Sequence, residues 1–348
     1  MPRHATPTPH PATGAPPGPL VDPQGRAIRY LRLAVTDRCN LRCRYCMPAE
    51  GIAFAPAREL LSWPELLALV DALARLGVDK VRLTGGEPFA RRGLMDFLAA
   101  VAALPHAPRV TITTNATLVG PHVAALRELG VAGVNVSLDA LDAPSFFRIT
   151  RRDLFDVVYA NLRALVEAGL RVKVNCVVLD GQNDDQLLAF AALTRELPVA
   201  VRFLEAMPFD GGTAPGAAPA RLAWDHRRIL AALRDAYPDL APLPRERPGQ
   251  PAAEYQIPGH VGRVGIVASY SRTFCGACDR IRVDARGGLR TCLYGANVAT
   301  FAPTLRAGGD VARGVRRVLA DALALRHADG RAAEAAYGTY ASMTAIGG

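Results

Sequence analysis

Lysine is almost missing from this sequence, although basic residues are common. Only Lys80 and Lys173 occur among 41 lysines and arginines, so arginine supplies nearly every other cation. Both lysines lie in apolar segments that are typical of β-strands, where a charged side chain is unusual. We interpret these two amines as having a chemical task.

Long apolar segments are also missing. No run approaches the roughly 18–20 apolar residues that span a bilayer, which argues against a membrane helix. The N-terminus is rich in proline and lacks the apolar segment of a secretory signal, so we expect a cytoplasmic protein. No basic run is interleaved with aromatic residues, and the net charge of +9 therefore favours scattered surface arginine over a nucleic-acid site.

The spacing of the cysteines predicts metal binding. Six of the seven cysteines fall into two triads, which in a cytosolic chain indicate metal binding or catalysis before disulfides. The triads are Cys39, Cys43 and Cys46, and Cys275, Cys278 and Cys292. Cys176 stands alone on the apolar face of a predicted strand, and we interpret it as a buried core thiol.

From residue 30 onward, short strand-like runs alternate with amphipathic helical patterns. This repetition predicts parallel strands joined by right-handed crossovers. Six units are too few for a closed eight-fold barrel, so the predicted fold is α/β, a partial (β/α)6 TIM-like barrel followed by an α+β C-terminal domain. The predicted strands are 30–36, 80–84, 109–114, 133–139, 171–179 and 199–205, and the predicted helices are 63–76, 94–104, 122–129, 154–168 and 184–197.

Composition divides the chain into three parts. Residues 1–28 are rich in proline, glycine and alanine, and we expect them to be disordered. A Pro/Gly/Ala-rich stretch after Met207 predicts a boundary, with the barrel over 29–215 and a C-terminal domain over 216–348.

The predicted strands alternate polar and apolar residues, whereas the strands of an ordinary parallel sheet are continuously apolar. Arg82 and Lys173 each lie between two apolar residues, and Thr113 follows Ile112. Because helices must cover the apolar face, the polar face points into the barrel. Unpaired cations in a dry lumen are costly, which predicts a water-filled lumen that takes an anionic ligand.

The first triad has the spacing C-x3-C-x2-C and directly follows the first predicted strand. Three thiolates within eight residues can hold three corners of a four-iron cluster and leave one iron open. Zinc fits less well, because a structural zinc site takes four ligands and usually C-x2-C pairs. At this motif the sequence resembles the radical S-adenosylmethionine (SAM) superfamily. The resemblance implies that SAM chelates the open iron and contacts Tyr45, Gly85, Gly86, Glu87, Ser137 and Met207.

The second triad is also one cysteine short, which favours a second 4Fe-4S cluster. A zinc knuckle completed by His260 or His327 is the alternative. Arg280 and Arg282 follow its C-x2-C pair on one side of a strand-like run, where guanidiniums can bind phosphate or lie on the surface. With these features and a terminal Gly-Gly, residues 29–348 resemble the GTP 3′,8-cyclase family of molybdenum cofactor biosynthesis.

This second resemblance implies a lyase in which a 5′-deoxyadenosyl radical removes the C3′ hydrogen of GTP. The C3′ radical then attacks guanine C8 and gives (8S)-3′,8-cyclo-7,8-dihydroguanosine 5′-triphosphate. The resemblance implies that all six triad cysteines ligate two 4Fe-4S clusters and that the tail residues Gly347 and Gly348 enter the active site. The implied GTP contacts are Arg32, Arg82, Thr113, Lys173, Arg280 and Arg282. Lys80 shares the polar strand face, and we therefore expect it to be an added phosphate cation.

The partners implied are an electron donor of flavodoxin or ferredoxin type, a downstream pterin synthase and a second copy in a homodimer. One position departs from the family, since Ala116 stands where glycine usually follows the asparagine. If that position needs a positive φ, alanine costs about 1 kcal/mol without abolishing activity. Two other functions stay open: a peptide-modifying radical SAM enzyme with an auxiliary cluster, and a zinc protein that binds nucleic acid.

Overall fold

A single curled sheet organises the chain. The computed structural model describes residues 20–207, 222–247 and 249–337. Its strands follow the order β12-β11-β10-β1-β2-β3-β4-β5-β6-β9-β8-β7. The strands are β1 (Tyr30–Ala34), β2 (Lys80–Thr84), β3 (Arg109–Thr114), β4 (Val134–Ser137), β5 (Val172–Val178), β6 (Ala200–Glu205), β7 (Ala241–Pro242), β8 (Ala252–Gln256), β9 (Arg263–Val267), β10 (Arg280–Val283), β11 (Gly288–Arg290) and β12 (Ala299–Thr300).

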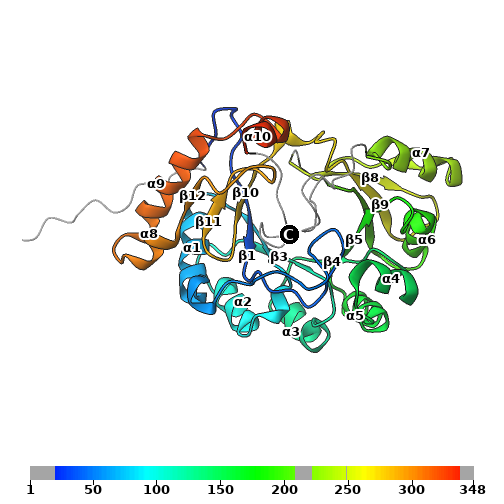
Figure 1. Cartoon of the computed structure of the whole chain (residues 1–348), viewed down its shortest axis with the longest axis horizontal. Helices are drawn as coiled ribbons and strands as arrows, with labels where there is room; N and C mark the ends of the chain where they lie inside the picture. The colour runs from blue at the N-terminus through cyan, green and yellow to red at the C-terminus, as the bar shows by residue number, and fades with distance from the viewer. Residues whose placement is uncertain (1–19, 208–221, 248, 338–348) are drawn as a thin grey trace, which may run out of the picture.

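Helices cover the outer side of the sheet. Figure 1 shows α1, α2, α3, α5 and α4 in an arc outside the strands that they connect, as expected for parallel strands with crossover helices. The helices are α1 (Trp63–Arg75), α2 (Leu94–Ala102), α3 (Val123–Glu128), α4 (Ala143–Thr150), α5 (Phe155–Glu167), α6 (Leu187–Ala192), α7 (His226–Ala236), α8 (Ala302–Arg306), α9 (Val311–Ala324) and α10 (Gly330–Tyr337).

The partial barrel is confirmed, and the C-terminal part extends it. Strands β1 to β6 are parallel as predicted, but β10 also pairs in parallel with β1, and β9 pairs in parallel with β6. Two strands from beyond residue 222 thus flank the six predicted ones in one sheet. The predicted boundary between 215 and 216 lies outside the described residues.

The alternation rule places the core correctly. Val81, Leu83 and Cys176 point toward the helices and are at most 2% exposed. Helix α1 begins where predicted, because Ser62 accepts a hydrogen bond from the Glu65 amide while the Glu65 carboxylate accepts one from the Ser62 amide. The predicted helix over 184–197 is shorter than expected: only 187–192 is α-helical, with 3-10 turns on either side.

The N-terminal prediction needs a correction. Residues 1–19 lie outside the described residues, but 20–28 are not disordered: Val21 and Ala27 form a β-bridge, and Asp22, Arg26 and Ile28 are buried. The composition of residues 20–28 did not predict this ordered structure, because buried ion pairs hold the segment in place and such pairs leave no apolar pattern in the sequence.

Candidate active site

One cavity opens at the carboxyl ends of the parallel strands, where barrels of this architecture carry their sites. The first cysteine triad forms part of its wall, and polar residues of β1 to β6 form much of the rest. Ten of the predicted SAM and GTP contacts line it: Arg32, Tyr45, Arg82, Gly85, Gly86, Thr113, Ser137, Met207, Arg280 and Arg282.

The loop of the first triad is fixed from outside by the end of α4. The amides of Arg42 and Arg44 donate to the carbonyls of Thr150 and Ile149, at 2.9 and 3.0 Å. Burial raises the pKa of Cys43, and the neighbouring Cys46 thiol raises it further. Three partly buried thiols that influence one another suit an iron–sulfur cluster, because thiolates are the ligands of such a centre.

The glycines of the turn after β2 have a packing role. A Cβ on Gly85 would lie 2.3 Å from the Thr36 carbonyl oxygen, and one on Gly86 would lie 2.2 Å from that of Arg38. The turn therefore packs directly against the segment that leads into Cys39. This close approach, as well as any contact with a ligand, requires glycine at both positions.

Glu87 does not line the cavity, although it was predicted as a SAM contact. Its carboxylate is fully buried and accepts hydrogen bonds from the Thr114 hydroxyl at 2.8 Å and the Asn115 amide at 2.7 Å. Burial raises the pKa of Glu87 to about 7. The side chain therefore ties the turn after β2 to the end of β3.

Tyr45 and Met207 reach the cavity from different sides. The Tyr45 hydroxyl donates to Asp139 at 2.5 Å, and this bond fixes the ring beside Cys46. Met207 lines the cavity and also packs in a small cluster with Cys292 and Leu293. It thus stands between the first-triad end of the cavity and the second triad.

Arginines of three neighbouring strands form a row across the sheet. The register aligns Arg282 of β10 with Arg32 of β1, and Arg32 with Arg82 of β2. Adjacent strands lie about 4.8 Å apart, so these guanidiniums lie close to one another on the cavity side. Burial lowers the pKa of Arg282 to about 10, with a further contribution from the nearby Arg280.

The Thr113 hydroxyl also indicates that a ligand binds in this cavity. Thr113 lines the cavity, and its buried hydroxyl has no hydrogen-bond partner among the described residues. A buried polar atom in a native protein is normally paired. The hydroxyl and the arginine row together fit a bound anion with hydrogen-bonding oxygens.

The two lysines are only partly buried and lie outside the lining of this cavity. Burial and arginines that line the cavity nevertheless lower the pKa of both amines. Burial, followed by repulsion from Arg82, lowers the pKa of Lys80 to about 7. Burial and Arg202 do the same to Lys173, whose pKa is also about 7. The Lys80 amine lies 4.7 Å from the centre of the Tyr30 ring.

The second triad lies behind the cavity wall. Its cysteines do not line the cavity, but the adjacent Phe274 and Leu293 do. Burial raises the pKa of Cys292, and Cys278 and Cys275 raise it further, so the three thiols are close together. They could hold three corners of a second cluster beside the cavity wall that Phe274 and Leu293 form.

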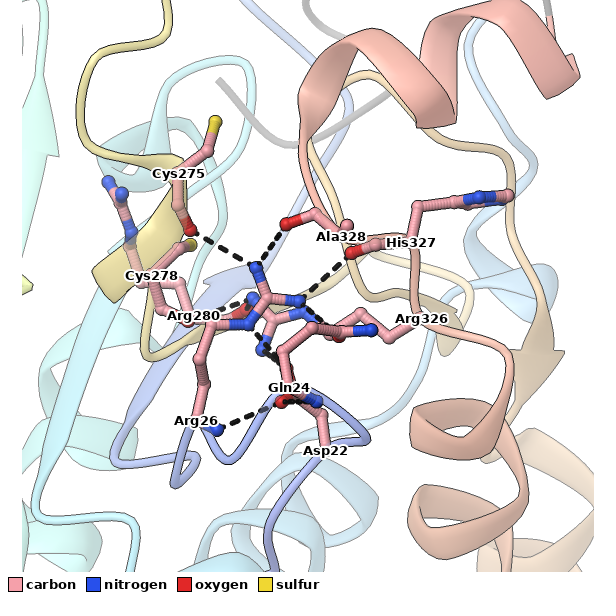
Figure 2. Close-up of polar contacts among 9 residues, drawn as sticks. All are labelled: Asp22, Gln24, Arg26, Cys275, Cys278, Arg280, Arg326, His327 and Ala328. Atoms are coloured by element: carbon pink, nitrogen blue, oxygen red, sulfur yellow. Dashed lines mark hydrogen bonds and ion pairs between the residues drawn. The ribbon is translucent and has the colours of Figure 1, made fainter.

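Neither histidine that could complete a zinc knuckle faces this triad. The His260 ring is hydrogen-bonded to Thr194, 2.8 Å away, before the start of β9. Figure 2 shows the His327 ring pointing away from Cys275 and Cys278. In the described ranges, no three His, Cys, Asp or Glu side chains form a group that could hold a single metal ion.

Arg202 is a cavity residue that the sequence interpretation passed over. It lines the cavity from β6 and pairs with Glu254 at 2.5 Å. The signal was available, because Arg202 lies between the buried Val201 and Phe203 in the same alternation that identified Arg82.

Gly347 and Gly348 lie outside the described residues. No described helix is long and apolar enough to cross a membrane.

Ala116 adopts the left-handed conformation that glycine favours, with a φ of 59°. Its methyl group is fully buried in the core, and this burial offsets the backbone cost of about 1 kcal/mol. We therefore expect Ala116→Gly to change stability by less than about 1 kcal/mol. Ala116→Val, which is branched and larger, should destabilise by about 3 kcal/mol or more. Thermal unfolding of the two variants checks this, and equal effects would contradict it.

Comparison with known families agrees with this arrangement. Residues 33–194 match the radical SAM superfamily, and residues 199–331 match the family described as Molybdenum Cofactor Synthesis C. The chain is 40% identical to GTP 3′,8-cyclase of Moorella thermoacetica, over 81% of this chain and 86% of that protein. It is 39% identical to GTP 3′,8-cyclase of Pelotomaculum thermopropionicum, over 88% and 94%.

Longer relatives and solved structures extend the comparison. Molybdenum cofactor biosynthesis protein 1 of Bos taurus is 40% identical over 83% of this chain, which spans 45% of that protein. Streptococcus suis SuiB bound to its precursor peptide SuiA has a TM-score of 0.59 at 15% identity, covering 92% of this chain and 76% of SuiB. This structural likeness concerns the fold alone.

Proposed function

Because this chain belongs to the GTP 3′,8-cyclase family of radical SAM enzymes, we propose that it converts GTP into 3′,8-cyclo-7,8-dihydro-GTP, the first step of molybdenum cofactor biosynthesis. Cys39, Cys43 and Cys46 would hold a 4Fe-4S cluster, and the chemistry such a cluster would supply is the one-electron reductive cleavage of SAM. The 5′-deoxyadenosyl radical formed from SAM would take the hydrogen atom from C3′ of GTP and leave as 5′-deoxyadenosine. The C3′ radical would then bond to C8 of guanine, and one electron from the reductant and one proton would complete the dihydro product. We further propose a second 4Fe-4S cluster on Cys275, Cys278 and Cys292.

The observation that carries this proposal is the arginine row of Arg282, Arg32 and Arg82. Three neighbouring guanidiniums repel one another, and burial deprives them of water, so the free cavity is electrostatically unfavourable. A triphosphate supplies three to four negative charges and oxygens that accept paired hydrogen bonds from arginine. The row thus favours a polyphosphate over a peptide, which would not neutralise it.

The main contribution of the protein side chains would be to position GTP and SAM. The arginine row and Thr113 would hold the triphosphate, while Tyr45 and the Gly85–Gly86 turn would hold SAM beside the first triad. Reacting atoms must lie within about 3–3.5 Å, and the phosphate contacts supply the energy that fixes them there. Guanine would extend toward the second triad, behind the part of the wall that Phe274 and Leu293 form.

The direct test is anaerobic incubation of the reconstituted protein with GTP, SAM and a reductant. We expect equal amounts of 5′-deoxyadenosine and a cyclised nucleotide, identified by mass spectrometry and by conversion to a pterin with alkali. GTP deuterated at C3′ should pass its label to 5′-deoxyadenosine. Unlabelled 5′-deoxyadenosine, or a requirement for a peptide, would contradict the proposal.

The two lysines predict a proton uptake on GTP binding. In the free protein both amines lose their charge as the pH rises through about 7. A bound triphosphate favours the charged amines, so GTP affinity should fall between pH 7 and 8.5, by up to tenfold per unit for each amine. Calorimetry in buffers of different ionisation enthalpy measures the uptake, which Lys80→Met and Lys173→Met should each reduce. Proton uptake in both variants as large as in the wild type would contradict this role.

We also propose that the electron donor is an acidic protein that docks outside the first triad. Arg44 lies between Cys43 and Cys46, and its guanidinium donates to the Arg148 carbonyl at 2.8 Å. Both side chains are exposed, and in the described part of the chain neither pairs with a carboxylate within 4 Å. Phe147 beside them is 55% exposed. Two exposed cations beside an exposed aromatic ring fit an acidic partner, although Arg148 also attracts the nearby Asp142 carboxylate.

Charge reversal at Arg148 tests this surface. Arg148→Glu should slow SAM cleavage driven by reduced flavodoxin about fivefold at low salt, and the effect should fade as salt screens the charges. Cleavage driven by dithionite should not change. Arg313→Glu, on the distant α9 with an 87% exposed side chain, is a control for charge reversal away from this surface, although Arg313 pairs with Asp310 at 3.5 Å. A slower dithionite reaction would instead indicate a damaged cluster loop.

Family membership alone supports three remaining proposals. The protein would work in the cytoplasm, form a homodimer, and pass its product to a pterin synthase that rearranges the cyclised nucleotide. The chain spans about half the length of the longer curated relatives, so these proposals concern the matched portion.

A further inference from the structure

A buried ion cluster ties the N-terminal segment to the second triad. Asp22 accepts from Arg26 Nε at 2.6 Å and from Arg326 Nη1 at 2.9 Å. The Asp22, Arg26 and Arg326 side chains are 0%, 7% and 2% exposed. Figure 2 shows the three side chains packed together beneath Cys275 and Cys278. We name these residues the carboxylate clamp.

The clamp uses its remaining donors on the backbone of the second triad. Arg26 Nη1 donates to the Cys275 carbonyl at 3.1 Å. Arg326 Nη2 donates to the Cys278 carbonyl at 3.0 Å and to the Arg280 carbonyl at 3.2 Å. Three carbonyls within one short segment are thus fixed by two guanidiniums, which a single carboxylate orients.

The clamp also reaches the connection between α9 and α10. Arg26 donates to the Ala328 carbonyl at 2.7 Å and the His327 carbonyl at 2.9 Å. Segments about 300 residues apart in the chain, at Asp22 and Arg326, therefore meet at one carboxylate. This is why residues 20–28 are ordered despite their composition.

Stability alone is a poor explanation for such a cluster. Removing three charged side chains from water is costly, and apolar residues of similar volume often stabilise a fold as well or better. A fully hydrogen-bonded buried network does, however, specify one geometry. Here the geometry it specifies is that of two cysteines and of Arg280, whose side chain lines the cavity.

We propose that Asp22, Arg26 and Arg326 are positioning residues for the second cluster, holding Cys275, Cys278 and Arg280 in place for substrate. This inference rests on the proposed function for the cluster itself. It gives residues 20–28 an indirect role in the active site, although none of these residues lines the cavity.

The first experiment measures the backbone without any cluster. Hydrogen–deuterium exchange of the apo full-length chain should be about tenfold faster over 273–282 in Arg26→Gln and Arg326→Gln than in the wild type. Exchange in β2 to β5 should not change. The matched control is Arg75→Gln. Arg75 Nε pairs with Asp71 Oδ2 at 2.9 Å, and the two residues are four apart in sequence, as Arg26 and Asp22 are, but the Arg75 side chain is 48% exposed.

The second experiment measures the cluster. A chain with Cys39, Cys43 and Cys46 all replaced by alanine would hold only the second cluster, whose EPR spectrum and midpoint potential can then be read alone. Arg326→Gln should alter the spectrum and shift the potential to more negative values, because a nearby positive charge is lost. Arg326→Lys keeps the charge, so it should restore the potential but only part of the slow exchange.

The outcomes separate the two proposals. Unchanged exchange over 273–282 in both glutamine variants would overturn the clamp. Faster exchange throughout the chain would also overturn it, since the role would then be general stability; if Arg326→Gln does not fold, Arg326→Lys supplies the same comparison. A wild-type protein without a second cluster would refute that part of the proposed function, while the exchange experiment would still decide the clamp.

Discussion

Replacing Cys275 with serine should leave SAM cleavage running and end GTP cyclisation. The first triad is untouched by this change, so 5′-deoxyadenosine should still form in the presence of reductant. The anchor for guanine is lost, however, and misplacement of reacting atoms by about 1 Å can cost roughly 100-fold. We therefore expect the amount of cyclised product to fall at least about 100-fold. The 5′-deoxyadenosine that still forms should carry less deuterium from C3′-deuterated GTP than in the wild type.

Replacing Cys43 with serine gives the contrasting result. The first cluster is lost, so neither 5′-deoxyadenosine nor cyclised nucleotide should form, while the iron of the second triad should remain. Iron analysis and product analysis on the two variants distinguish the roles of the triads. Full cyclisation by Cys275→Ser protein that lacks the second iron–sulfur signal would refute the substrate-binding role of the second cluster.

Replacing Arg32 with methionine should weaken GTP binding and stabilise the free protein. Arg32 lies in the middle of the arginine row, and burial followed by repulsion from Arg282 lowers its pKa well below the usual range. Losing a desolvated phosphate contact costs about 2–3 kcal/mol, which raises the Kd about 30- to 150-fold. Without ligand, removal of the like charge should raise the Tm by about 1–2 °C.

Arg29→Met is the control for this pair of effects. Arg29 precedes β1 by one residue, but its side chain is 53% exposed and pairs with Asp79 on the surface. We expect little change in GTP affinity and no gain in Tm. Calorimetric titration and thermal unfolding of apo protein make both measurements. A lower Tm in Arg32→Met would mean that the row stabilises the fold by itself, contrary to our account.

Several features followed from local sequence. The triad spacing, the turn after β2 and the strand–helix alternation each depend on residues close in the chain, and so they could be interpreted one segment at a time. The same alternation predicted that Arg82 and Thr113 face the lumen and that Cys176 faces the helices, and the structure confirms these placements.

Other features depend on contacts between distant segments. Nothing in the spacing of Arg280 and Arg282 indicates that β10 pairs with β1, yet this pairing puts Arg282 beside Arg32. The order of residues 20–28 likewise depends on Arg326, which meets Asp22 at 2.9 Å.

The sequence by itself therefore determined the kind of chemistry and the barrel that carries it, because cysteine spacing and hydrophobic period are local properties. Tertiary structure alone decided which cations gather in one row and which carboxylate holds the second triad. Such groupings arise when packing brings remote strands and loops together, and the burial that then makes each charge demand a partner exists only in the folded chain.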